Sequence, residues 1–442
     1  MSAPQEFKRL LRRVVVRLRH LLAPVRSTRA RLQERFSAWL RRLPIPARLR
    51  STLYRYVPWR PWLITVPLER LLLGPQNGLT ARQFSEALGE RMWASTPITA
   101  SPHLELLRRG HRDHLSDEEI LGSRYAEMAR VIIRETGNFF DATDEAGLLA
   151  EARNFLARSL GEGELSRKPR VGETPRNSNV RAVRIAGSRC LQLVDGHHRA
   201  ALLAFFGETS VKVRTSWVST TTPLQDLLNR MSWIDGQREL YQPIDAPELA
   251  DDWTTVRRCT DRMRKMEDFL KQANIAPEGG RYLDVACCYG WFVNEFDSLG
   301  FSASGVERDP LAPELAETVY GLDPEQIVVK DAVEFLSTNT QQYDVVTCLS
   351  LLHHFALGRA TVTAAELVSL LDNSTRRVLF LDTGQSHEDW LRRTLPGWDT
   401  SDVVEFLRHE TTFREVIDLG PDEDAVPPYE GNYGRHLFAC LR

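Results

Sequence analysis

The sequence predicts an α/β protein with two domains and a basic helical arm in front of them. Residues 250–442 alternate strand and helix patterns, which is typical of a parallel, doubly wound sheet. A compact strand–strand–helix–strand series lies within residues 95–220 and predicts a smaller α+β domain. Apolar residues make up 42% and charged residues 26% of the 442, so the composition is that of a globular protein and excludes a fibre or a long disordered chain.

Residues 1–62 are predicted to form the basic arm, an amphipathic helix followed by aromatic residues. Residues 1–60 carry sixteen Lys or Arg and two Glu, although the whole chain has a net charge of −2. Such a helix suits an anionic membrane surface, where each basic residue contributes about 1 kcal/mol. It is also suited to docking on the acidic remainder of this chain, and nucleic acid is the least favoured partner.

The cellular location follows from what the sequence lacks. Six cysteines in 442 residues do not make a disulfide framework, so reduced, cytoplasmic thiols are expected. No window has the ~18 uncharged apolar residues of a membrane span. We therefore expect a cytoplasmic protein that associates with the inner face of the cell membrane through residues 1–60.

The middle region, residues 63–240, is predicted to be helical at first and then to form the smaller domain. The expected elements are helices over 125–136 and 145–160, a loop over 161–179, strands over 180–185 and 190–194, a helix over 197–206 and a strand over 210–217. A polar connector over 242–252 leads to a helix over 254–273. We place the domain boundary near residue 245.

A strand, a tight turn and a helix N-terminus meet at Asp195-Gly-His-His-Arg199. Gly196 permits the turn. The first amides of the helix, with His197, His198 and Arg199, are expected to face outward as an anion site. A guanidinium group can bind two phosphate oxygens at once.

The block VDGHHRAALLAFFGETSVKV resembles the ParB/sulfiredoxin superfamily, whose matching turn binds nucleotide phosphates. The resemblance implies that Asp195, Gly196, His197, His198 and Arg199 bind phosphate, with ATP or another nucleotide as the ligand. Some members are nucleotide-dependent phosphotransferases and others are nucleotide-gated DNA clamps, so the resemblance selects no reaction. A vestigial fold that serves only as a scaffold is the alternative.

In the C-terminal domain, a strand over 282–285 runs into the turn Ala286-Cys-Cys-Tyr-Gly290. A turn at this place brings backbone close to a ligand, which favours small residues. Glu307 ends the second strand, 23 positions after Asp284, and a carboxylate there can accept both hydroxyls of a ribose. Further strands are expected over 326–329, 343–349, 377–382, 413–419 and 435–441.

Residues 250–442 resemble a class I S-adenosylmethionine-dependent methyltransferase, which has a Rossmann-like sheet of seven strands. The matching blocks are LDVACCYGWF, GVERDP, VVKDAVEFL, YDVVTCLSLLHHF and RVLFLDTG. The resemblance implies S-adenosylmethionine as the cofactor. The resemblance implies that the methionine part contacts Asp284, Ala286, Cys288, Tyr289 and Gly290, and that the ribose contacts Glu307. It also implies that Asp331 and Ala332 contact the adenine and that Leu349 lines the cleft.

The first motif of that family departs from its usual form here. Of its three glycines only Gly290 remains, with Ala286 and Cys288 at the other places. A sheet that has lost its cofactor is therefore an alternative, and an NAD site is a weaker one because G-x-G-x-x-G is absent. The Cys287-Cys288 pair is interpreted as small residues of the turn. No spacing of His and Cys predicts a metal site.

Methyl transfer requires the protein to align an acceptor and to remove its proton. His353 and His354 follow the fourth strand, where an acceptor is expected; His354 is our first candidate for the general base and His353 the second. The predicted acceptor bears a hydroxyl and is a glycan or glycolipid intermediate. The alternatives are a bifunctional kinase–methyltransferase acting on such an acceptor and a nucleotide-gated DNA-binding protein.

Overall fold

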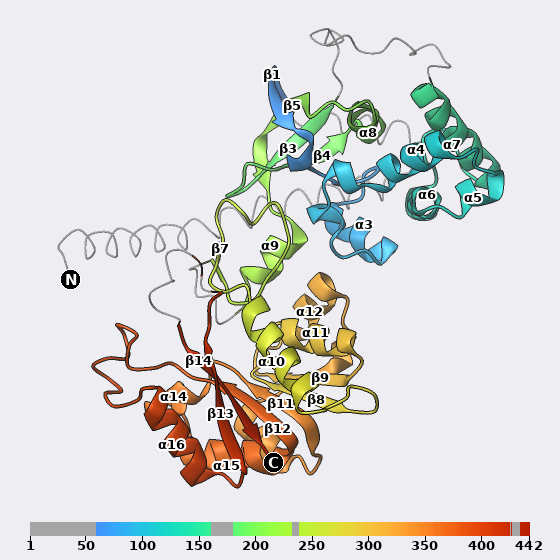
Figure 1. The fold of residues 1–442 in the computed structure, drawn as a ribbon. Coiled ribbons are helices and arrows are strands. Elements are labelled where there is room, and N and C mark those ends of the chain that lie inside the picture. Colours follow the sequence, from blue (N-terminus) through green and yellow to red (C-terminus); the bar gives the residue numbers. More distant parts are fainter. Residues whose placement is uncertain (1–58, 161–179, 232–237, 425, 427–433) are drawn as a thin grey trace, which may run out of the picture. The chain divides into compact units, whose positions relative to one another are not determined.

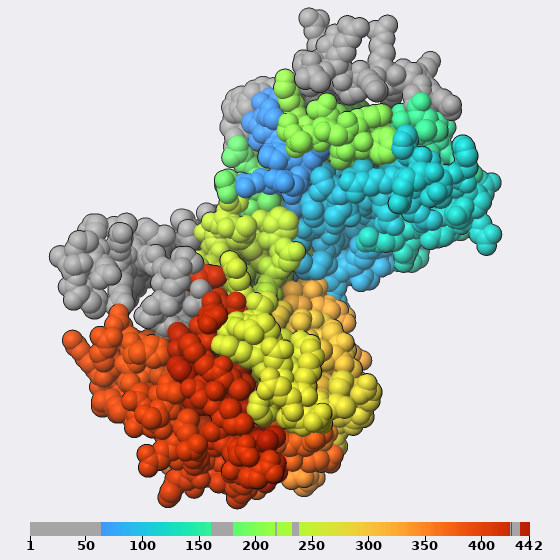
Figure 2. Space-filling model, viewed as in Figure 1, coloured from blue at the N-terminus to red at the C-terminus, as the bar shows by residue number. Residues whose placement is uncertain are grey.

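The structure is a computed structural model that describes residues 59–160, 180–231, 238–424, 426 and 434–442. The chain forms two compact units (Figures 1 and 2). Unit 1 comprises the described residues up to Asp226 together with 246–252, and unit 2 comprises those of 227–245 and 253–442. The predicted boundary near 245 is thus one of three points at which the chain passes between the units. Residues 1–58, which include nearly all of the predicted arm, lie outside the described residues.

Unit 1 contains a five-stranded sheet in the order β1-β5-β3-β4-β2. Its strands are β1 (Trp59–Pro67), β2 (Leu71–Leu72), β3 (Arg181–Ile185), β4 (Leu191–Asp195) and β5 (Ser210–Thr220). β1 pairs antiparallel with β5, with Pro67 opposite Ser210. The assignment of residues 59–67 to a helical arm and a helical region is therefore wrong. These residues form a strand whose partner lies far along the chain, and no local sequence pattern reveals such a pairing.

The helices of unit 1 cover this sheet and pack on one another around one apolar core. They are α3 (Ala81–Leu88), α4 (Pro102–Arg112), α5 (Asp117–Leu121), α6 (Arg124–Thr136), α7 (Glu145–Leu160) and α8 (His197–Phe205); α9 (Pro223–Leu228) lies where the chain passes into unit 2. Short 3-10 turns occur at Leu68–Arg70, Trp93–Ser95 and Ile98–Ala100. The helices expected over 125–136 and 145–160 are present as α6 and α7.

Residues 246–252 return to unit 1 and are fixed there by two carboxylates. Glu248 is fully buried and accepts hydrogen bonds from Ser95 Oγ at 2.5 Å and Thr222 Oγ1 at 2.9 Å. Asp251 accepts a hydrogen bond from the main-chain amide of Arg189 at 2.8 Å and pairs with its guanidinium group. This segment is therefore an integral part of unit 1, although it lies inside the predicted connector.

Unit 2 contains a seven-stranded sheet in the order β10-β9-β8-β11-β12-β14-β13. Its strands are β8 (Arg281–Val285), β9 (Ser302–Glu307), β10 (Ile327–Val329), β11 (Tyr343–Cys348), β12 (Thr375–Asp382), β13 (Glu415–Pro421) and β14 (His436–Leu441). β14 runs antiparallel to both of its neighbours, and the other pairs are parallel. The prediction of an α/β sheet with seven strands is confirmed.

Helices cover both faces of this sheet, so it has an apolar core on each side. One core includes α10 (Thr260–Gln272), α11 (Trp291–Leu299) and α12 (Ala312–Tyr320); the other includes α13 (Ala332–Thr338), α14 (Leu352–Ala356), α15 (Ala364–Ser374) and α16 (Thr400–Glu410). A 3-10 turn lies at Pro324–Gln326. Because both faces are covered, every residue of β11 is buried, as in a central parallel strand.

The helix expected over 254–273 begins later than predicted. Residues Thr254–Thr255 form a short strand, β7, which pairs parallel with β6 (Glu239–Leu240). Cys259 precedes α10 with a φ of 66°, a left-handed conformation that cannot continue a helix. The helix therefore starts at Thr260.

Candidate active site

The carboxyl ends of parallel strands bring several predicted site residues to one edge of the unit 2 sheet. Val285 ends β8 and pairs with Val306 of β9 and Cys348 of β11. The turn over 286–290 and Glu307 follow directly from these strand ends. In open α/β sheets, ligands bind outside the carboxyl ends of the strands.

In the turn between β8 and α11, every second residue has a left-handed backbone conformation. The φ angles of Ala286, Cys288 and Gly290 are 61°, 57° and 83°. A side chain in this region costs roughly 1–2 kcal/mol, so the first two residues are strained. A Cβ atom on Gly290 would lie 2.9 Å from Ile327 Cδ1 and 3.1 Å from Leu322 Cδ1. The turn therefore keeps the conformation of a glycine-rich loop, and at its last position a side chain would press against the ends of two neighbouring side chains.

The carboxylate of Glu307 lies against this turn. Its Oε2 accepts a hydrogen bond from the Cys288 amide at 3.0 Å, and its Oε1 accepts from the amides of Arg308 at 2.8 Å and Asp309 at 3.2 Å. Burial raises the pKa of Glu307, and the amides of Asp309 and Cys288 offset part of that effect. The turn over 286–290 and Glu307, which the spacing from Asp284 predicted to lie together, are thus in direct contact.

Asp284 lies beneath the turn, inside the sheet. Its Oδ1 accepts a hydrogen bond from Thr347 Oγ1 at 2.7 Å, and the Thr347 hydroxyl also lies 2.7 Å from Tyr282 Oη. Burial raises the pKa of Asp284 to about 7, although the Thr347 hydroxyl opposes this shift. Thr347 was not predicted as a site residue, because its only signal in the sequence was a hydroxyl between the apolar residues Val346 and Cys348.

The residues predicted to hold an adenine lie at the next strand end. Asp331 precedes α13 and is exposed, and its Oδ1 accepts hydrogen bonds from the amides of Val333 at 2.9 Å and Glu334 at 3.3 Å. Ala332 begins the helix and is half-buried, as is Leu349 after β11. The structure therefore places these three residues at the same edge of the sheet as Glu307.

His353 and His354 are neighbours on α14 but have different surroundings. His353 is buried, and its Nδ1 accepts a hydrogen bond from the Gly384 amide at 3.1 Å. Burial, and then the charge of Arg435, lower the pKa of His353 to about 2. His354 is exposed, and partial desolvation followed by the charge of Arg359 lowers its pKa below the ordinary value. His353 therefore supports the main chain at Gly384, while His354 is accessible to solvent.

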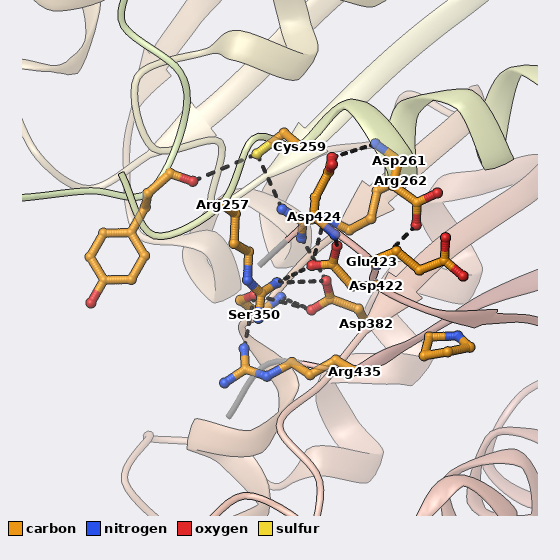
Figure 3. Close-up of polar contacts among 12 residues, drawn as sticks. Arg257, Cys259, Asp261, Arg262, Ser350, Asp382, Asp422, Glu423, Asp424 and Arg435 are labelled. Atoms are coloured by element: carbon orange, nitrogen blue, oxygen red, sulfur yellow. Dashed lines mark hydrogen bonds and ion pairs between the residues drawn. The ribbon is translucent and has the colours of Figure 1, made fainter. Parts of the chain in front are cut away.

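A buried network of ion pairs lies beyond β12 (Figure 3). Arg262 Nη1 lies 2.6 Å from Asp382 Oδ2, and Arg257 Nη1 lies 3.4 Å from the same atom and 3.4 Å from Asp422 Oδ2. Ser350 joins the network, because Asp382 Oδ1 accepts from its amide at 2.6 Å and Arg435 Nη1 donates to its hydroxyl at 3.0 Å. Segments from α10, β12, β13 and β14 are thus held together at this edge.

Electrostatics explain why these charges are tolerated in the interior. Burial favours the neutral form of Asp382, but Arg262 and Arg257 hold its pKa well below the usual range. Burial and the charges of Arg435 and Arg262 lower the pKa of Arg257 to about 10. No sequence pattern predicted this network, because its members lie far apart in a chain with 57 basic residues.

In unit 1, the motif at residues 195–199 has the predicted turn but a different orientation. Gly196 precedes α8 with a φ of 93°. His197 and His198 are buried, which corrects the expectation that both face outward. Arg199 is exposed and Asp195 is half-buried. The correction has a physical reason, because the first turn of α8 packs against α4 and α7.

The two inward histidines belong to a cluster of aromatic rings. Tyr125 Oη lies 2.8 Å from His198 Nε2, and the His198 ring stacks on Phe155 at a centroid distance of 4.0 Å. His103 stacks on His197 at 5.7 Å. Burial lowers the pKa of both His197 and His198 to about 3, so these imidazoles are neutral at physiological pH.

Among the described residues, no three His, Cys, Asp or Glu side chains are grouped in a way that could hold a metal ion. In the same part of the chain, no helix has both the length and the apolar composition needed to cross a membrane.

Comparison with known proteins identifies the class of unit 2. Residues 258–423 match the family described as "Methyltransferase domain". No curated protein matches the chain. This part of the chain is therefore a methyltransferase domain, which confirms the prediction at that level; the resemblance of unit 1 to the ParB/sulfiredoxin superfamily stays a prediction.

Solved structures that are similar to this chain include three methyltransferases. The bifunctional kinase-methyltransferase WbdD is 19% identical with a TM-score of 0.38, over 49% of this chain and 46% of that chain, so the match spans less than half of WbdD. The magnesium protoporphyrin IX methyltransferase ChlM from Synechocystis PCC 6803, with bound SAM, is 16% identical over 41% and 79%, with a TM-score of 0.31. The methyltransferase domain of bacterial CtHen1 is 14% identical over 41% and 97%, with a TM-score of 0.31.

Proposed function

We propose that unit 2 binds S-adenosylmethionine and transfers its methyl group to a hydroxyl-bearing acceptor. The observation that carries this proposal is the contact of 3.0 Å between Glu307 Oε2 and the Cys288 amide. It places an acidic side chain directly beside the turn at the carboxyl edge of the sheet. A carboxylate has about four acceptor positions, and the three amide hydrogen bonds leave one on Oε2 for a ribose hydroxyl.

The chemistry of the surrounding residues fits such a cofactor. Backbone over 286–290 can approach the methionine part, because the turn is left-handed at alternate residues and Gly290 has no side chain. Asp331 and Ala332 would contact the adenine, and Leu349 would line the cleft. When bound, the cofactor supplies an electrophilic methyl group, so the protein itself needs only to orient the acceptor and accept a proton.

His354 is the residue that we propose as the general base. It is exposed beyond the end of β11, and its pKa is lowered, so its imidazole is neutral at pH 7 and able to accept a proton. His353 would act indirectly, since its Nδ1 is engaged with Gly384.

An exposed aromatic ring supports a glycan or glycolipid as the acceptor. Trp390 is 40% exposed, and its ring centroid lies 5.4 Å from that of His353, whose ring also contacts His354. Its Nε1 donates to Glu388 Oε2 at 2.8 Å, which fixes the orientation of the indole. An aromatic face with a fixed orientation can pack against the apolar face of a sugar ring. Trp390→Ala should raise KM for a glycan acceptor while leaving kcat nearly unchanged.

Calorimetry with S-adenosylmethionine tests the cofactor assignment. The unmutated protein should bind it, and Glu307→Ala should abolish measurable binding because the ribose loses its acceptor. Glu405→Ala, an exposed change on α16, is the matched control and should bind normally. An unmutated protein that does not bind the cofactor would remove the proposal.

A second candidate function concerns unit 1. The first amides of α8 follow Gly196 without a side-chain cap, and Arg199 is exposed beside them, which favours a phosphate or nucleotide ligand at this helix N-terminus. A kinase in unit 1 would make the chain a bifunctional kinase–methyltransferase. ATP consumption that Arg199→Ala abolishes and Arg184→Ala leaves intact would support this function; equal turnover in both variants would exclude the proposed site.

Association with the inner face of the cell membrane remains a proposal from the sequence of residues 1–60. Sedimentation with anionic vesicles compares the full chain with a chain that lacks residues 1–58. Binding that the deletion abolishes, and that weakens as salt rises, is the expected result.

A further inference from the structure

The cofactor turn lacks two of the glycines that make such a turn easy to form. Ala286 and Cys288 both have positive φ angles, each at a cost of roughly 1–2 kcal/mol. A strained conformation persists only where surrounding contacts hold it. The contacts that hold the turn come from a segment that precedes the family-matched region.

Gln242 makes two side-chain hydrogen bonds with the turn and the helix that follows it. Its Nε2 donates to the carbonyl oxygen of Cys287 at 3.1 Å, and its Oε1 accepts from the amide of Trp291 at 3.1 Å. Trp291 is the first residue of α11, whose early amides lack partners within the helix. One amide side chain thus joins the middle of the turn to the start of the helix.

Tyr289 adds a second connection to the same residue. Its hydroxyl accepts a hydrogen bond from the main-chain amide of Gln242 at 2.8 Å and donates to the Gln242 carbonyl at 2.5 Å. Tyr289 is fully buried, and Gln242 is only 6% exposed. In addition, Tyr320 Oη donates to the carbonyl oxygen of Pro243 at 2.5 Å. Water therefore does not compete for these contacts, and the Gln242 segment is itself fixed.

We infer that Gln242 and Tyr289 are positioning residues that hold the cofactor turn in its binding conformation and replace the contribution of the two missing glycines. This inference rests on the proposed function, since it concerns the turn that the cofactor would contact. A protein whose binding conformation is only partly populated binds its ligand more weakly in proportion. Without the Gln242 contacts, the strained turn would populate other conformations and cofactor affinity would fall.

The test compares binding of S-adenosylhomocysteine by Gln242→Ala and the unmutated protein, using calorimetry. The dissociation constant should rise at least tenfold. Gln342→Ala is the matched control, because the Gln342 side chain in the same unit makes one exposed amide hydrogen bond, to the carbonyl oxygen of Asn373, and lies outside the turn. Gln242→Glu should bind as poorly as Gln242→Ala, because a carboxylate would face the Cys287 carbonyl oxygen.

A rescue experiment separates positioning from general loss of structure. Glycine adopts positive φ without steric cost, so Cys288→Gly added to Gln242→Ala should restore most of the lost affinity. Hydrogen exchange provides a readout that does not need the ligand. Amides over 286–292 should exchange faster in Gln242→Ala and return toward the unmutated rate in the double variant.

The outcomes distinguish the inference from the proposed function. If the unmutated protein does not bind S-adenosylhomocysteine, the proposed function fails, and hydrogen exchange still decides whether Gln242 holds the turn. If the cofactor binds but Gln242→Ala changes neither affinity nor exchange, the inference is overturned. Should Gln242→Ala fail to fold, Tyr289→Phe, which removes only a hydroxyl, must show the same two effects in weaker form.

Discussion

Arg435 and Glu388 form a two-pronged ion pair in the interior of unit 2. Arg435 Nε lies 2.7 Å from Glu388 Oε1, and Arg435 Nη2 lies 2.9 Å from Glu388 Oε2. The side chains are 4% and 0% exposed. This pair joins the residue before β14 to the segment after β12, next to the indole of Trp390. It therefore fixes the backbone on the side where we place the acceptor.

Loss of this carboxylate should destabilise unit 2 strongly. Glu388→Gln removes the carboxylate that pairs with two nitrogens of the buried Arg435, and breaking a buried ion pair in this way typically costs about 3–5 kcal/mol. Urea denaturation measures the change. Glu267→Gln is the control, because its exposed pair with Lys271 is worth at most about 0.5 kcal/mol. Similar losses in both variants would contradict the importance of the buried pair.

The buried histidines of unit 1 predict loss of stability in acid. Unfolded histidines bind protons below pH 6.5, whereas folded His197 and His198 have pKa values of about 3 and the pKa of folded His103 is also lowered by burial. Stability present above pH 6.5 should therefore be lost as the pH falls toward 3, by up to about 1.4 kcal/mol per pH unit for each histidine. Hydrogen exchange of α8 amides at pH 7.5 and 5.5, corrected for the intrinsic rate, measures this loss.

A single substitution should reduce that pH dependence. His198→Phe removes one of the three groups and keeps an aromatic ring against Phe155. Unfolding of this variant in acid should take up about one proton fewer, so its free energy of unfolding should depend less steeply on pH, whatever its stability at pH 7.5. His114→Gln, which changes an exposed histidine, should leave the slope intact. An unchanged slope in His198→Phe would refute the assignment.

The raised pKa of Asp284 predicts that the stability of unit 2 changes with pH in the opposite direction. Its folded pKa is about 7, above the unfolded value near 4, so its contribution to stability is present at low pH and is lost as the pH rises through 7. Asp284→Asn imitates the protonated form and should reduce the loss between pH 5 and 8. Exchange of β8 amides at the two pH values checks this, with the exposed change Asp268→Asn as the control.

His354 predicts a pH profile for methyl transfer. A general base must be deprotonated, and the pKa of His354 lies below its ordinary value, so the rate should be on its plateau at pH 7 and fall only below pH 6.5. His354→Gln should lower kcat by about 10²–10⁴ without changing the affinity for the cofactor. Release of S-adenosylhomocysteine in the presence of sugar-terminated acceptors measures the rate. A normal rate in His354→Gln would exclude it as the base.

Alanine substitutions at Gly290 and Gly321 distinguish the cost of steric contact from the cost of backbone strain. Both have positive φ, 83° and 73°, but a Cβ on Gly290 meets two side chains at 2.9 and 3.1 Å, whereas Gly321 faces open space. Gly321→Ala should cost only the roughly 1–2 kcal/mol of the left-handed conformation. Gly290→Ala should cost more and should also weaken cofactor binding. Equal effects on stability and binding would show that the turn tolerates a side chain.

Local patterns predicted those parts of the structure that local physics determines. The alternation of strands and helices gave the sheet of unit 2, and the spacing from Asp284 to Glu307 correctly placed a carboxylate at the turn. Helical periodicity likewise located α6 and α7. Each of these signals lies within about 25 positions of the chain, although some strands of the sheet pair across longer separations, as Val345 does with Tyr282.

Features that depend on distant contacts were beyond the sequence pattern. The two polar histidines at the start of α8 indicated a solvent-facing site, but they lie inward because rings from four other helices or loops surround them. β1 was missed because its partner is β5. The Arg262–Asp382 pair and the contacts of Gln242 with the turn also join residues from separate segments, which no single motif reveals.

The return of residues 246–252 to unit 1 has a practical consequence for dissecting the protein. A fragment that starts at 258, where the family match begins, omits Gln242 together with the rest of the unit 2 residues over 227–245. A fragment that ends at 245 lacks Glu248 and Asp251 of unit 1 and still carries the 227–245 portion of unit 2. Neither half can therefore be excised intact by one cleavage, and activities assayed on such pieces would understate those of the whole chain.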